Sequence, residues 1–258
     1  MHFDPLQDNK SRFELLRWMG GDLAIVNSAK KSYEKKATEM GEREKKLLST
    51  LIMPFLRFGV DASHPDTKHS SPLRSTVFVF DVRLPMFLCM QFYKHTIASC
   101  FVEAQRNWQQ ASERYMNLGK GEDYYYPAAR LQSQSNKQAS SEDEVPKDIE
   151  EAWQAALLKN VAAGHHYTVL MEDLGIAREL ANRLESRFIY TSVEWTCSLE
   201  SALHFCDLRN EPGAQQEIRE YAFAMWVVLQ DKCPVVTELW EKRREIIREA
   251  VREYLAKQ

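Results

Sequence analysis

Residues 80–115 read FDVRLPMFLCMQFYKHTIASCFVEAQRNWQQASERY, and the rest of the chain can be arranged around this stretch. The run of β-branched and aromatic residues over Ser75–Val82 predicts a strand that leads into it. Pro85 suits the first position of a helix, and the apolar residues Met86–Tyr93 predict that helix. A strand that passes directly into an apolar helix is therefore the expected centre of the fold.

Polar side chains follow this apolar helix. Its end delivers Gln91, Lys94 and His95 to one place, and two of these side chains can carry a positive charge. A second polar cluster, Gln109–Tyr115, comes shortly afterwards. Hydrogen-bond donors and cations gathered at the end of a hydrophobic element indicate a site for an anionic ligand.

The totals of the sequence limit the class of protein. The chain has 258 residues, of which 44% are hydrophobic, so it can bury a large core in one domain or at most two. Its formal net charge of −3 gives no basic field of the kind that favours nucleic acid. No apolar run approaches the roughly 20 residues that span a bilayer, and Met1–Pro5 lacks the features of a signal peptide. We therefore expect a cytoplasmic protein that binds neither nucleic acid nor membrane.

The cysteine and histidine patterns predict neither disulfides nor a metal site. Five cysteines form no Cys-x-x-Cys pair and lie mostly in apolar or helical contexts, so reduced core thiols are expected. They are Cys89, Cys100, Cys197, Cys206 and Cys233. No spacing of metal ligands occurs, and His165–His166 fits a solvated helix pair.

Helical patterns dominate the remaining sequence. Phe13, Leu16 and Met19 are spaced as on a helix, and Asp22 is expected to be the N-cap of a further helix from Leu23. Other helices are expected over Gly41–Phe58, Ile149–Leu174, Ala177–Leu184, from Leu199 after an N-cap at Ser198, around Ile218–Val228 and over Glu238–Leu255. Phe188–Thr196 is strand-like, and residues 131–147 are expected to form an exposed loop. Many helices with few strands predict an α+β fold in a single domain.

A series of short motifs runs in one order from about Met19 to Pro234. The motifs are Met19–Tyr33, Lys68–Leu73, Val77–Phe80, Leu84–His95, Gln109–Tyr115, Tyr126–Pro127, Gly175–Asn182, Tyr190–Thr191, Trp195–Thr196, Leu208–Arg209 and Ala214–Arg219. Each motif alone is weak, but their ordered series resembles the flavin-dependent thymidylate synthases, which methylate dUMP without a cysteine nucleophile. The resemblance covers nearly the whole chain.

This resemblance implies a fold and a set of ligands. The fold would be a single α+β domain with helices packed around a small, mainly antiparallel sheet. The cofactor would be FAD, with NADPH as the source of electrons and methylenetetrahydrofolate as the carbon donor. Family members assemble as homotetramers that share active sites between subunits, so a homo-oligomer that binds dUMP is expected.

The resemblance also assigns residues to the two ligands. Those expected to line the flavin are Ser32, Ser71, Lys94, His95, Thr96, Ser198 and His204. Those expected to hold the nucleotide are Gln91, Gln110, Ser112, Arg114, Glu179, Asn182, Arg183 and Arg209. Arg114 would present a two-donor fork to the phosphate. Arg209 would be catalytic, stabilising negative charge on the base as its carbon 5 becomes nucleophilic.

Several of these residues also have simpler interpretations. Arg114 and Arg209, without the resemblance, would be surface ion-pair residues. Glu179 fits an ion pair with Arg183 as well as it fits a site role. Ser71 is also suited to capping a turn.

The chain departs from the family pattern at several of its site positions. Lys94-His95-Thr96 replaces Arg-His-Arg, and Gln109-Gln110 replaces Asn-Glu. Asn182, with Arg183 beside it, stands where the family has arginine, and Ser198-Leu199-Glu200 replaces Asn-Leu-Arg. Roughly eight extra residues, about two helical turns, precede Gln109. Because Glu200 reverses a charge that would face the flavin pyrophosphate, weaker or altered flavin binding is predicted.

Three functions remain open from the sequence. The first is an FAD-dependent thymidylate synthase that converts dUMP to dTMP. The second is a relative that alkylates another pyrimidine nucleotide, such as dCMP, or transfers a hydroxymethyl group; the extra residues and Gln109-Gln110 favour it. The third is a nucleotide-binding protein without catalytic activity, which Thr96, Ser198 and Glu200 favour.

Overall fold

The fold is built on one antiparallel sheet, as the sequence predicts. A computed structural model describes residues 1–53, 68–95, 108–112, 123–137 and 139–256. The sheet has the strand order β1-β2-β3-β5-β4, and every neighbouring pair is antiparallel. Its strands are β1 His2–Phe3, β2 Arg12–Met19, β3 Val77–Pro85, β4 Trp108–Gln110 and β5 Tyr190–Ser198. The predicted α+β class is confirmed.

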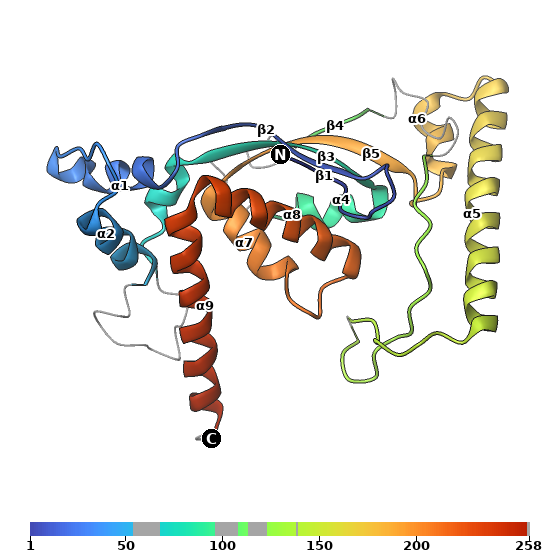
Figure 1. Cartoon of the computed structure of the whole chain (residues 1–258). Coiled ribbons are helices and arrows are strands. Elements are labelled where there is room, and N and C mark those ends of the chain that lie inside the picture. Colours follow the sequence, from blue (N-terminus) through green and yellow to red (C-terminus); the bar gives the residue numbers. More distant parts are fainter. Residues whose placement is uncertain (54–67, 96–107, 113–122, 138, 257–258) are drawn as a thin grey trace.

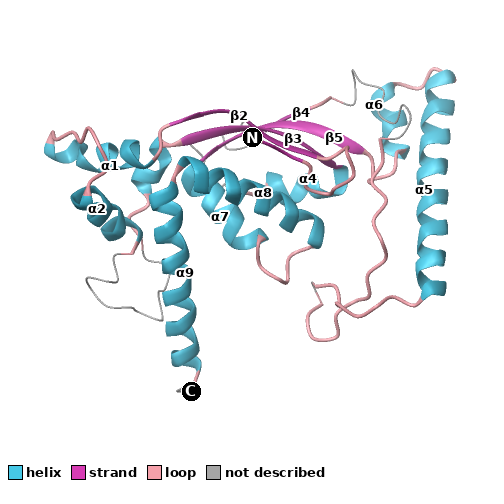
Figure 2. Cartoon of the chain, viewed as in Figure 1, coloured by secondary structure: helices cyan, strands magenta, loops and turns pink. Residues whose placement is uncertain are grey.

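Helices cover one face of this sheet. The α-helices are α1 Asp22–Lys30, α2 Glu42–Ile52, α4 Met86–Tyr93, α5 Lys147–Asp173, α6 Arg178–Ala181, α7 Leu199–Arg209, α8 Gln216–Lys232 and α9 Pro234–Leu255. Short 3-10 turns are η1 Lys31–Tyr33, η2 Ser71–Ser75 and η4 Asn182–Leu184. Figure 2 shows α4, α7 and α8 packed beneath the strands. The core lies between these two layers.

Aromatic rings fill that core. Phe80 of β3 lies 4.7 Å from Phe13 of β2, measured between ring centroids. Phe92 of α4 lies 4.7 Å from Phe205 of α7, and both rings contact Trp195 of β5. Burying several such rings contributes strongly to stability, since each removes a large apolar area from water. The ring contacts therefore fix α4 and α7 against each other and against the sheet.

The helical pattern expected over residues 13–19 is wrong, because this segment is strand β2. Phe13 is fully buried, whereas Leu16 and Met19 are 44% and 65% exposed, so the three residues do not share a buried helical face. The segment instead pairs with β3, from Arg12 opposite Arg83 to Met19 opposite Val77. Pairing with a neighbouring strand has overridden the local spacing.

The role expected for Asp22 is also wrong. Helix α1 begins at Asp22 itself, and its N-cap position is Gly21. The Asp22 carboxylate accepts hydrogen bonds from the backbone N–H groups of Val235, at 2.9 Å, and Val236, at 3.1 Å. These groups lie in the first turn of α9, where they have no partner within the helix. Asp22 thus caps a helix more than 200 residues away in the sequence and ties α1 to α9.

Other sequence predictions are confirmed. Helix α4 has the expected bounds, Met86–Tyr93, although Pro85, expected at its first position, is its N-cap residue and the last residue of β3. Ser198 caps α7, since its hydroxyl accepts a hydrogen bond from the Ser201 N–H at 3.2 Å. Gly175 follows the end of α5 with φ of 81°, a conformation that favours glycine. Helix α9 begins at Pro234, four residues before the expected start.

The cysteines agree with the expectation of reduced thiols. Four of them are buried and form no disulfide with a described residue, namely Cys89, Cys197, Cys206 and Cys233. Cys100 lies outside the described residues. Burial raises the pKa of the Cys206 and Cys233 thiols, which favours their unreactive, protonated form.

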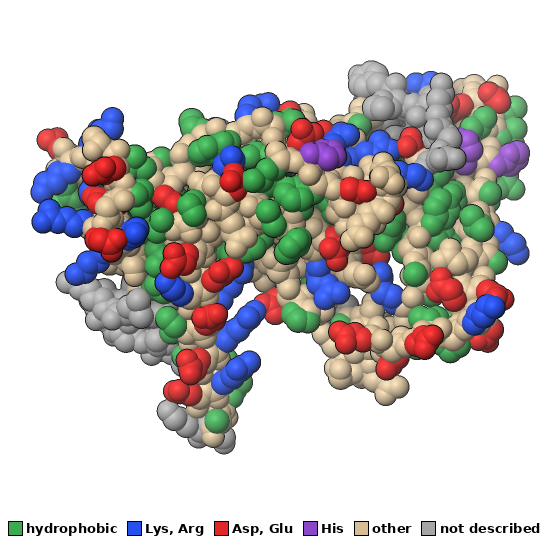
Figure 3. Space-filling view, viewed as in Figure 1, with side chains coloured by type: hydrophobic (Ala, Val, Ile, Leu, Met, Phe, Trp, Pro, Cys, Tyr) green, Lys and Arg blue, Asp and Glu red, His purple; other side chains and the backbone are tan. Residues whose placement is uncertain are grey.

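Helix α5 stands at the edge of the molecule (Figure 1). Residues 123–146 lead to it, apart from residue 138, which is not described. Most side chains over 131–147 are exposed, as predicted for this loop. Exposed apolar side chains lie along α5 and the segment that follows it; they include Leu158, Tyr167, Leu174 and Leu180, at 55%, 52%, 67% and 62% exposure. Charged side chains of both signs are interspersed over the face in Figure 3.

In the described residues, no helix combines the length and apolar character needed to cross a bilayer.

Candidate active site

Side chains from three helix ends meet beneath the sheet. Arg209, the last residue of α7, donates from Nε to His95 Nε2 at 3.0 Å and from Nη2 to the Gln91 carbonyl at 3.4 Å. The Gln91 side chain donates from Nε2 to Gln215 Oε1 at 2.7 Å. Gln91 lies in α4, and Gln215 is the N-cap residue of α8. We call these four residues the Gln91–Arg209 cluster.

The aromatic packing explains why this cluster forms. Phe92 and Phe205 are in contact across α4 and α7. His95 follows Phe92 by three residues, and Arg209 follows Phe205 by four, so each polar residue lies about one turn beyond its aromatic anchor. Joining the anchors therefore brings the polar residues together. The predicted convergence of Gln91 and Arg209 is found, whereas Arg114 lies outside the described residues.

The charge of Arg209 is not balanced by a carboxylate in the described part of the chain. Its two hydrogen-bond acceptors are an imidazole nitrogen and a backbone carbonyl, both neutral when His95 is unprotonated. Burial lowers the pKa of Arg209, although an arginine stays charged near neutral pH. A half-buried cation without a counter-ion attracts anionic or acceptor groups of a ligand, because its charge is only partly solvated.

His95 is held neutral in the same cluster. Its side chain is almost completely buried, with 7% exposure. Burial, together with the neighbouring Arg209 and His204, lowers the pKa of His95 to about 4. The ring centroids of His95 and His204 are 5.9 Å apart. Thus the cluster carries its positive charge on Arg209 rather than on the imidazole.

The residues expected to line the flavin divide into groups. Lys94 is exposed at the end of α4, next to His95, and His204 is half-buried beside that ring. Ser32 and Ser71 are exposed on η1 and η2. Ser198 is fully buried and caps α7. Thr96 lies outside the described residues. Their contacts with a flavin remain predictions.

Glu200 is bound by side chains of η2 and the residue before it. Its Oε2 accepts from Arg74 Nε at 2.7 Å, and its Oε1 accepts from the Ser70 hydroxyl. Glu200 is 7% exposed, so its charge is compensated inside the chain by Arg74. The negative charge of Glu200 is therefore neutralised by Arg74, and the weaker flavin binding expected from the sequence stays a prediction.

A second group of expected nucleotide contacts lies elsewhere in the same chain. Glu179 and Arg183 are exposed and Asn182 is buried, on α6 and η4. Figure 1 places α6 against α5, at the far end from α7 and α9. The structure thus does not bring these three residues to Arg209 within one subunit.

The remaining expected nucleotide contacts lie at the edge of the sheet. Gln110 is exposed on β4 and donates weakly, at 3.4 Å, to the Thr191 hydroxyl. Ser112 is half-buried just beyond β4. Strand β4 itself was not expected from the sequence, which gave only a polar cluster there.

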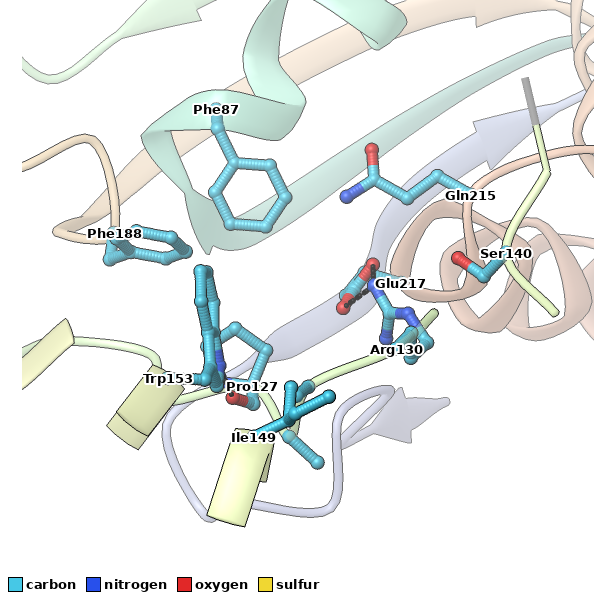
Figure 4. Close-up of a pocket in the computed structure, with 11 residues that line it drawn as sticks. Phe87, Pro127, Arg130, Ser140, Ile149, Trp153, Phe188, Gln215 and Glu217 are labelled. Atoms are coloured by element: carbon cyan, nitrogen blue, oxygen red, sulfur yellow. Dashed lines mark hydrogen bonds and ion pairs between the residues drawn. The ribbon is translucent and has the colours of Figure 1, made fainter. Parts of the chain in front are cut away.

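A cavity of about 400 Å³ adjoins the Gln91–Arg209 cluster. In Figure 4, Phe87, Trp153 and Phe188 gather at one end, and Arg130 lies with Glu217 at the other. Gln215 points toward the cavity from the side of α8, so this residue belongs both to the cavity and to the cluster. An apolar pocket with a few fixed polar groups is the usual form of a small-molecule site.

Sequence reasoning missed most of this cavity. Arg130 donates to the buried Glu217 at 2.8 Å, and Trp153 donates from Nε1 to the Pro127 carbonyl at 2.8 Å. The motifs Tyr126–Pro127 and Ala214–Arg219 contribute Pro127, Gln215 and Glu217 to the lining, and they were the available signal. The aromatic end is assembled from three distant segments and leaves no pattern in the sequence.

The described residues contain no group of three or more His, Cys, Asp or Glu side chains that could hold a metal ion.

Comparison with known proteins identifies the family. Residues 14–235 match the family model described as "Thymidylate synthase complementing protein". The chain belongs to this family. A flavin-dependent thymidylate synthase from Rickettsia conorii is 31% identical over 245 residues, covering 89% of this chain and 75% of the relative. One from Treponema denticola is 32% identical over 243 residues, covering 92% and 81%.

Solved structures agree on the fold of this family. A UMP/dUMP methylase, PolB from Streptomyces cacaoi, was solved with 5-Br dUMP and matches with a TM-score of 0.70. The match has 22% sequence identity and covers 89% of this chain and 94% of the other. The same protein solved with 5-Br UMP gives a TM-score of 0.69. The resemblance stated from the motifs is therefore confirmed for family and fold.

The residues present fit the flavin that gives the family relatives their name. The Lys94 ammonium group and the hydroxyls of Ser32 and Ser71 are exposed, and these groups make no hydrogen bond or ion pair with the described residues. A flavin dinucleotide offers anionic and carbonyl acceptors, which such donors suit. This donor set matches an anionic cofactor of that kind.

Proposed function

We propose that this chain is a flavin-dependent methyltransferase that acts on carbon 5 of a pyrimidine nucleoside monophosphate. The leading substrate is dUMP, converted to dTMP with methylenetetrahydrofolate as carbon donor and NADPH as reductant. One observation carries this proposal. Arg209 is a half-buried cation that donates hydrogen bonds to His95 and to the Gln91 carbonyl, and it has no carboxylate partner in the described residues.

In this proposal, Arg209 acts on the pyrimidine base. Methylation at carbon 5 requires that carbon to become nucleophilic, which spreads negative charge onto the ring oxygens. A fixed guanidinium stabilises this charge without having to reorganise during the reaction. A carboxylate in contact with Arg209 would cancel part of that effect, and the described chain supplies none.

The neighbouring residues set the position of the nucleotide. Gln91 is itself held by Gln215, so its amide is already ordered before a ligand binds. Arg114 is proposed to bind the phosphate, because its fork of donors matches a phosphate better than a lysine does. Lys94, His204, Ser32 and Ser71 are proposed to hold the flavin, which supplies the redox chemistry when it is bound.

The active site is proposed to be shared between copies of the chain. Glu179, Asn182 and Arg183 resemble nucleotide-binding positions, yet α6 lies away from α7 in one subunit. The exposed Leu158, Leu174 and Leu180 form apolar surface of the kind that oligomers bury. A homo-oligomer, expected to be a tetramer, would let a second copy bring α6 to the cluster.

Tritium release tests the proposed reaction. Purified protein is incubated with FAD, NADPH, methylenetetrahydrofolate and one nucleotide labelled with tritium at position 5, chosen from dUMP, UMP and dCMP. Release from dUMP together with dTMP is the expected result. Absence of release from all three, in protein shown by spectrum to carry FAD, would overturn the proposal.

Two further functions have specific observations in their favour. Release mainly from UMP or dCMP, or a hydroxymethyl product, would support a different pyrimidine substrate; Gln109-Gln110 and Asn182 depart from the family pattern on the nucleotide side. A nucleotide-binding protein without activity is favoured by Glu200, which has replaced a cation with a neutral ion pair. Nucleotide binding without a flavin spectrum would identify that case.

A further inference from the structure

His95 is fixed on every side that the structure describes. Its backbone N–H donates to the Phe92 carbonyl at 2.9 Å, which closes the last turn of α4. Its ring meets the Phe205 ring edge-on, with centroids 4.8 Å apart and an angle of 73°. With 7% exposure, the imidazole has little freedom to rotate away from Arg209.

The contact with Arg209 decides where the imidazole proton lies. An arginine Nε carries a hydrogen and can only donate, so His95 Nε2 must accept with its lone pair. In a neutral ring the single proton then lies on Nδ1. His95 Nδ1 makes no hydrogen bond to the described residues.

The surroundings oppose protonation of His95. The titratable groups that face its ring in the described structure are Arg209 and His204, and neither is an acid. A second proton on the ring would remove the acceptor of the Arg209 hydrogen bond and place two cations 3.0 Å apart. The depressed pKa of His95 agrees with this geometry.

We infer that His95 is a positioning residue: its neutral imidazole accepts the Arg209 Nε–H and thereby sets the plane of the guanidinium that faces the nucleotide. This role rests on the proposed function only for the identity of the ligand. It differs from the direct flavin contact that the family resemblance implies, because the nitrogen Nε2 is already committed to Arg209. In this inference, Arg209 Nη1, which makes no hydrogen bond to the described residues, is the group that the ligand meets.

Two substitutions separate an acceptor from a ring that merely fills space. His95→Gln keeps an acceptor near the position of Nε2, and His95→Phe keeps a similar aromatic volume without any acceptor. His166→Phe provides a matched control, since His166 is exposed on α5 and is not part of the cluster. Thermal unfolding of all three variants verifies that they fold.

Binding of dUMP to the full-length protein is then measured by calorimetry. His95→Phe is expected to weaken dUMP binding roughly 10- to 100-fold, as expected for a lost hydrogen bond to a charged group. His95→Gln is expected to stay within about threefold of the unmodified protein, and so is His166→Phe. Equal weakening by Gln and Phe, or no weakening by Phe, would overturn the inference.

A measurement without ligand keeps the inference separate from the proposed function. Histidine labelled with nitrogen-15 in the unmodified protein reports which ring nitrogen carries the proton. We expect one histidine with the proton on Nδ1 and an unprotonated Nε2 from pH 8 to pH 5, and the loss of this signature in His95→Gln. A His95 that protonates near pH 6.5 contradicts the inference. If no pyrimidine nucleotide binds but the signature is present, the proposed function fails while the role of His95 stands.

Discussion

Two residues of the candidate site, His95 and Glu200, have a charge state or a charge partner that the motifs alone did not indicate. His95 stands between two positions that are basic in the family, yet burial and Arg209 keep it neutral. Glu200 reverses a charge, yet Arg74 balances it. In both cases the partner is distant in sequence, so the residue types were predictable but their protonation and pairing were not.

The pH dependence of stability should report on His95. Its pKa is about 4 in the folded chain against an ordinary value of 6.5, so between these values the unfolded chain binds more protons. The contribution of His95 is therefore complete above pH 6.5 and is lost as the pH falls toward 4. Allowing for solvent screening, roughly 2 kcal/mol of unfolding free energy is expected to depend on it.

Urea unfolding at pH 7.0 and pH 4.5 measures this effect. The loss of stability on acidification should be smaller in His95→Phe than in the unmodified chain, because Phe cannot take up a proton in the unfolded state. His166→Phe should behave like the unmodified chain. Identical pH dependence in His95→Phe and the unmodified protein would show that His95 is not buried in its neutral form.

Replacing Glu200 by arginine, the residue that the family has at this position, should destabilise the fold when it is made alone. Glu200→Arg would place a second cation against Arg74 in a site with 7% exposure. We expect a loss of roughly 3 kcal/mol or more in unfolding free energy, since a paired, buried acid is replaced by an unpaired charge. The double variant Glu200→Arg with Arg74→Glu should recover most of this loss, as measured by urea unfolding. Full stability of the single variant would be inconsistent with the observed ion pair.

At the scale of elements, local sequence patterns predicted helices correctly where the signals for the helix lie within its own sequence. Helix α4 and the capping of α7 by Ser198 were predicted because apolar runs and caps act locally. Strand β2 was missed because its hydrogen bonds are made to β3, about 65 residues later in the chain. The Gln91–Arg209 cluster was predictable only through the resemblance, since the ring contact between Phe92 and Phe205 that forms it is tertiary.

Asp22 should stabilise α9 from a distance. Asp22→Ala removes the acceptor for two backbone N–H groups, at Val235 and Val236, and should cost about 1–2 kcal/mol of unfolding free energy. Asp22→Asn retains one oxygen and should cost less. Differential scanning calorimetry and urea unfolding measure both, with Asp173→Ala, an exposed residue at the end of α5, as a control. Equal stability of Asp22→Ala and the unmodified chain would exclude the capping role.

At the scale of the whole molecule, one chain separates residues that the proposed reaction needs together. The sheet and its helices hold Arg209, whereas Glu179 of α6 and Asn182 of η4 lie beside α5 at the edge of the molecule (Figure 1). The sequence predicted the single α+β domain correctly, but it contains no signal for which parts of a site lie in which subunit. The exposed apolar side chains near α6 support the proposal that a second copy of the chain covers them.

Oligomerisation should depend on that apolar surface. Leu174→Lys with Leu180→Lys puts two charges on residues that are 67% and 62% exposed in the single chain, so the monomer should fold normally. Light scattering coupled to size-exclusion chromatography should show an oligomer, expected to be a tetramer, for the unmodified protein and smaller species for the double variant. Lysines at Glu245 and Glu249, two exposed residues of α9, would serve as controls, because α9 lies away from α5 and α6 (Figure 1). A monomer at all concentrations would contradict a site shared between subunits.

The proposed binding of a pyrimidine nucleotide by Arg209 is tested most directly by calorimetric titration of dUMP into the unmodified protein and into Arg209→Ala. Arg248→Ala is the control, since Arg248 forms a surface ion pair with Glu211. Removing a guanidinium that contacts the bound base should weaken dUMP binding roughly 100-fold, while the control stays unchanged. Equal dUMP affinity in Arg209→Ala and the unmodified protein would contradict the account.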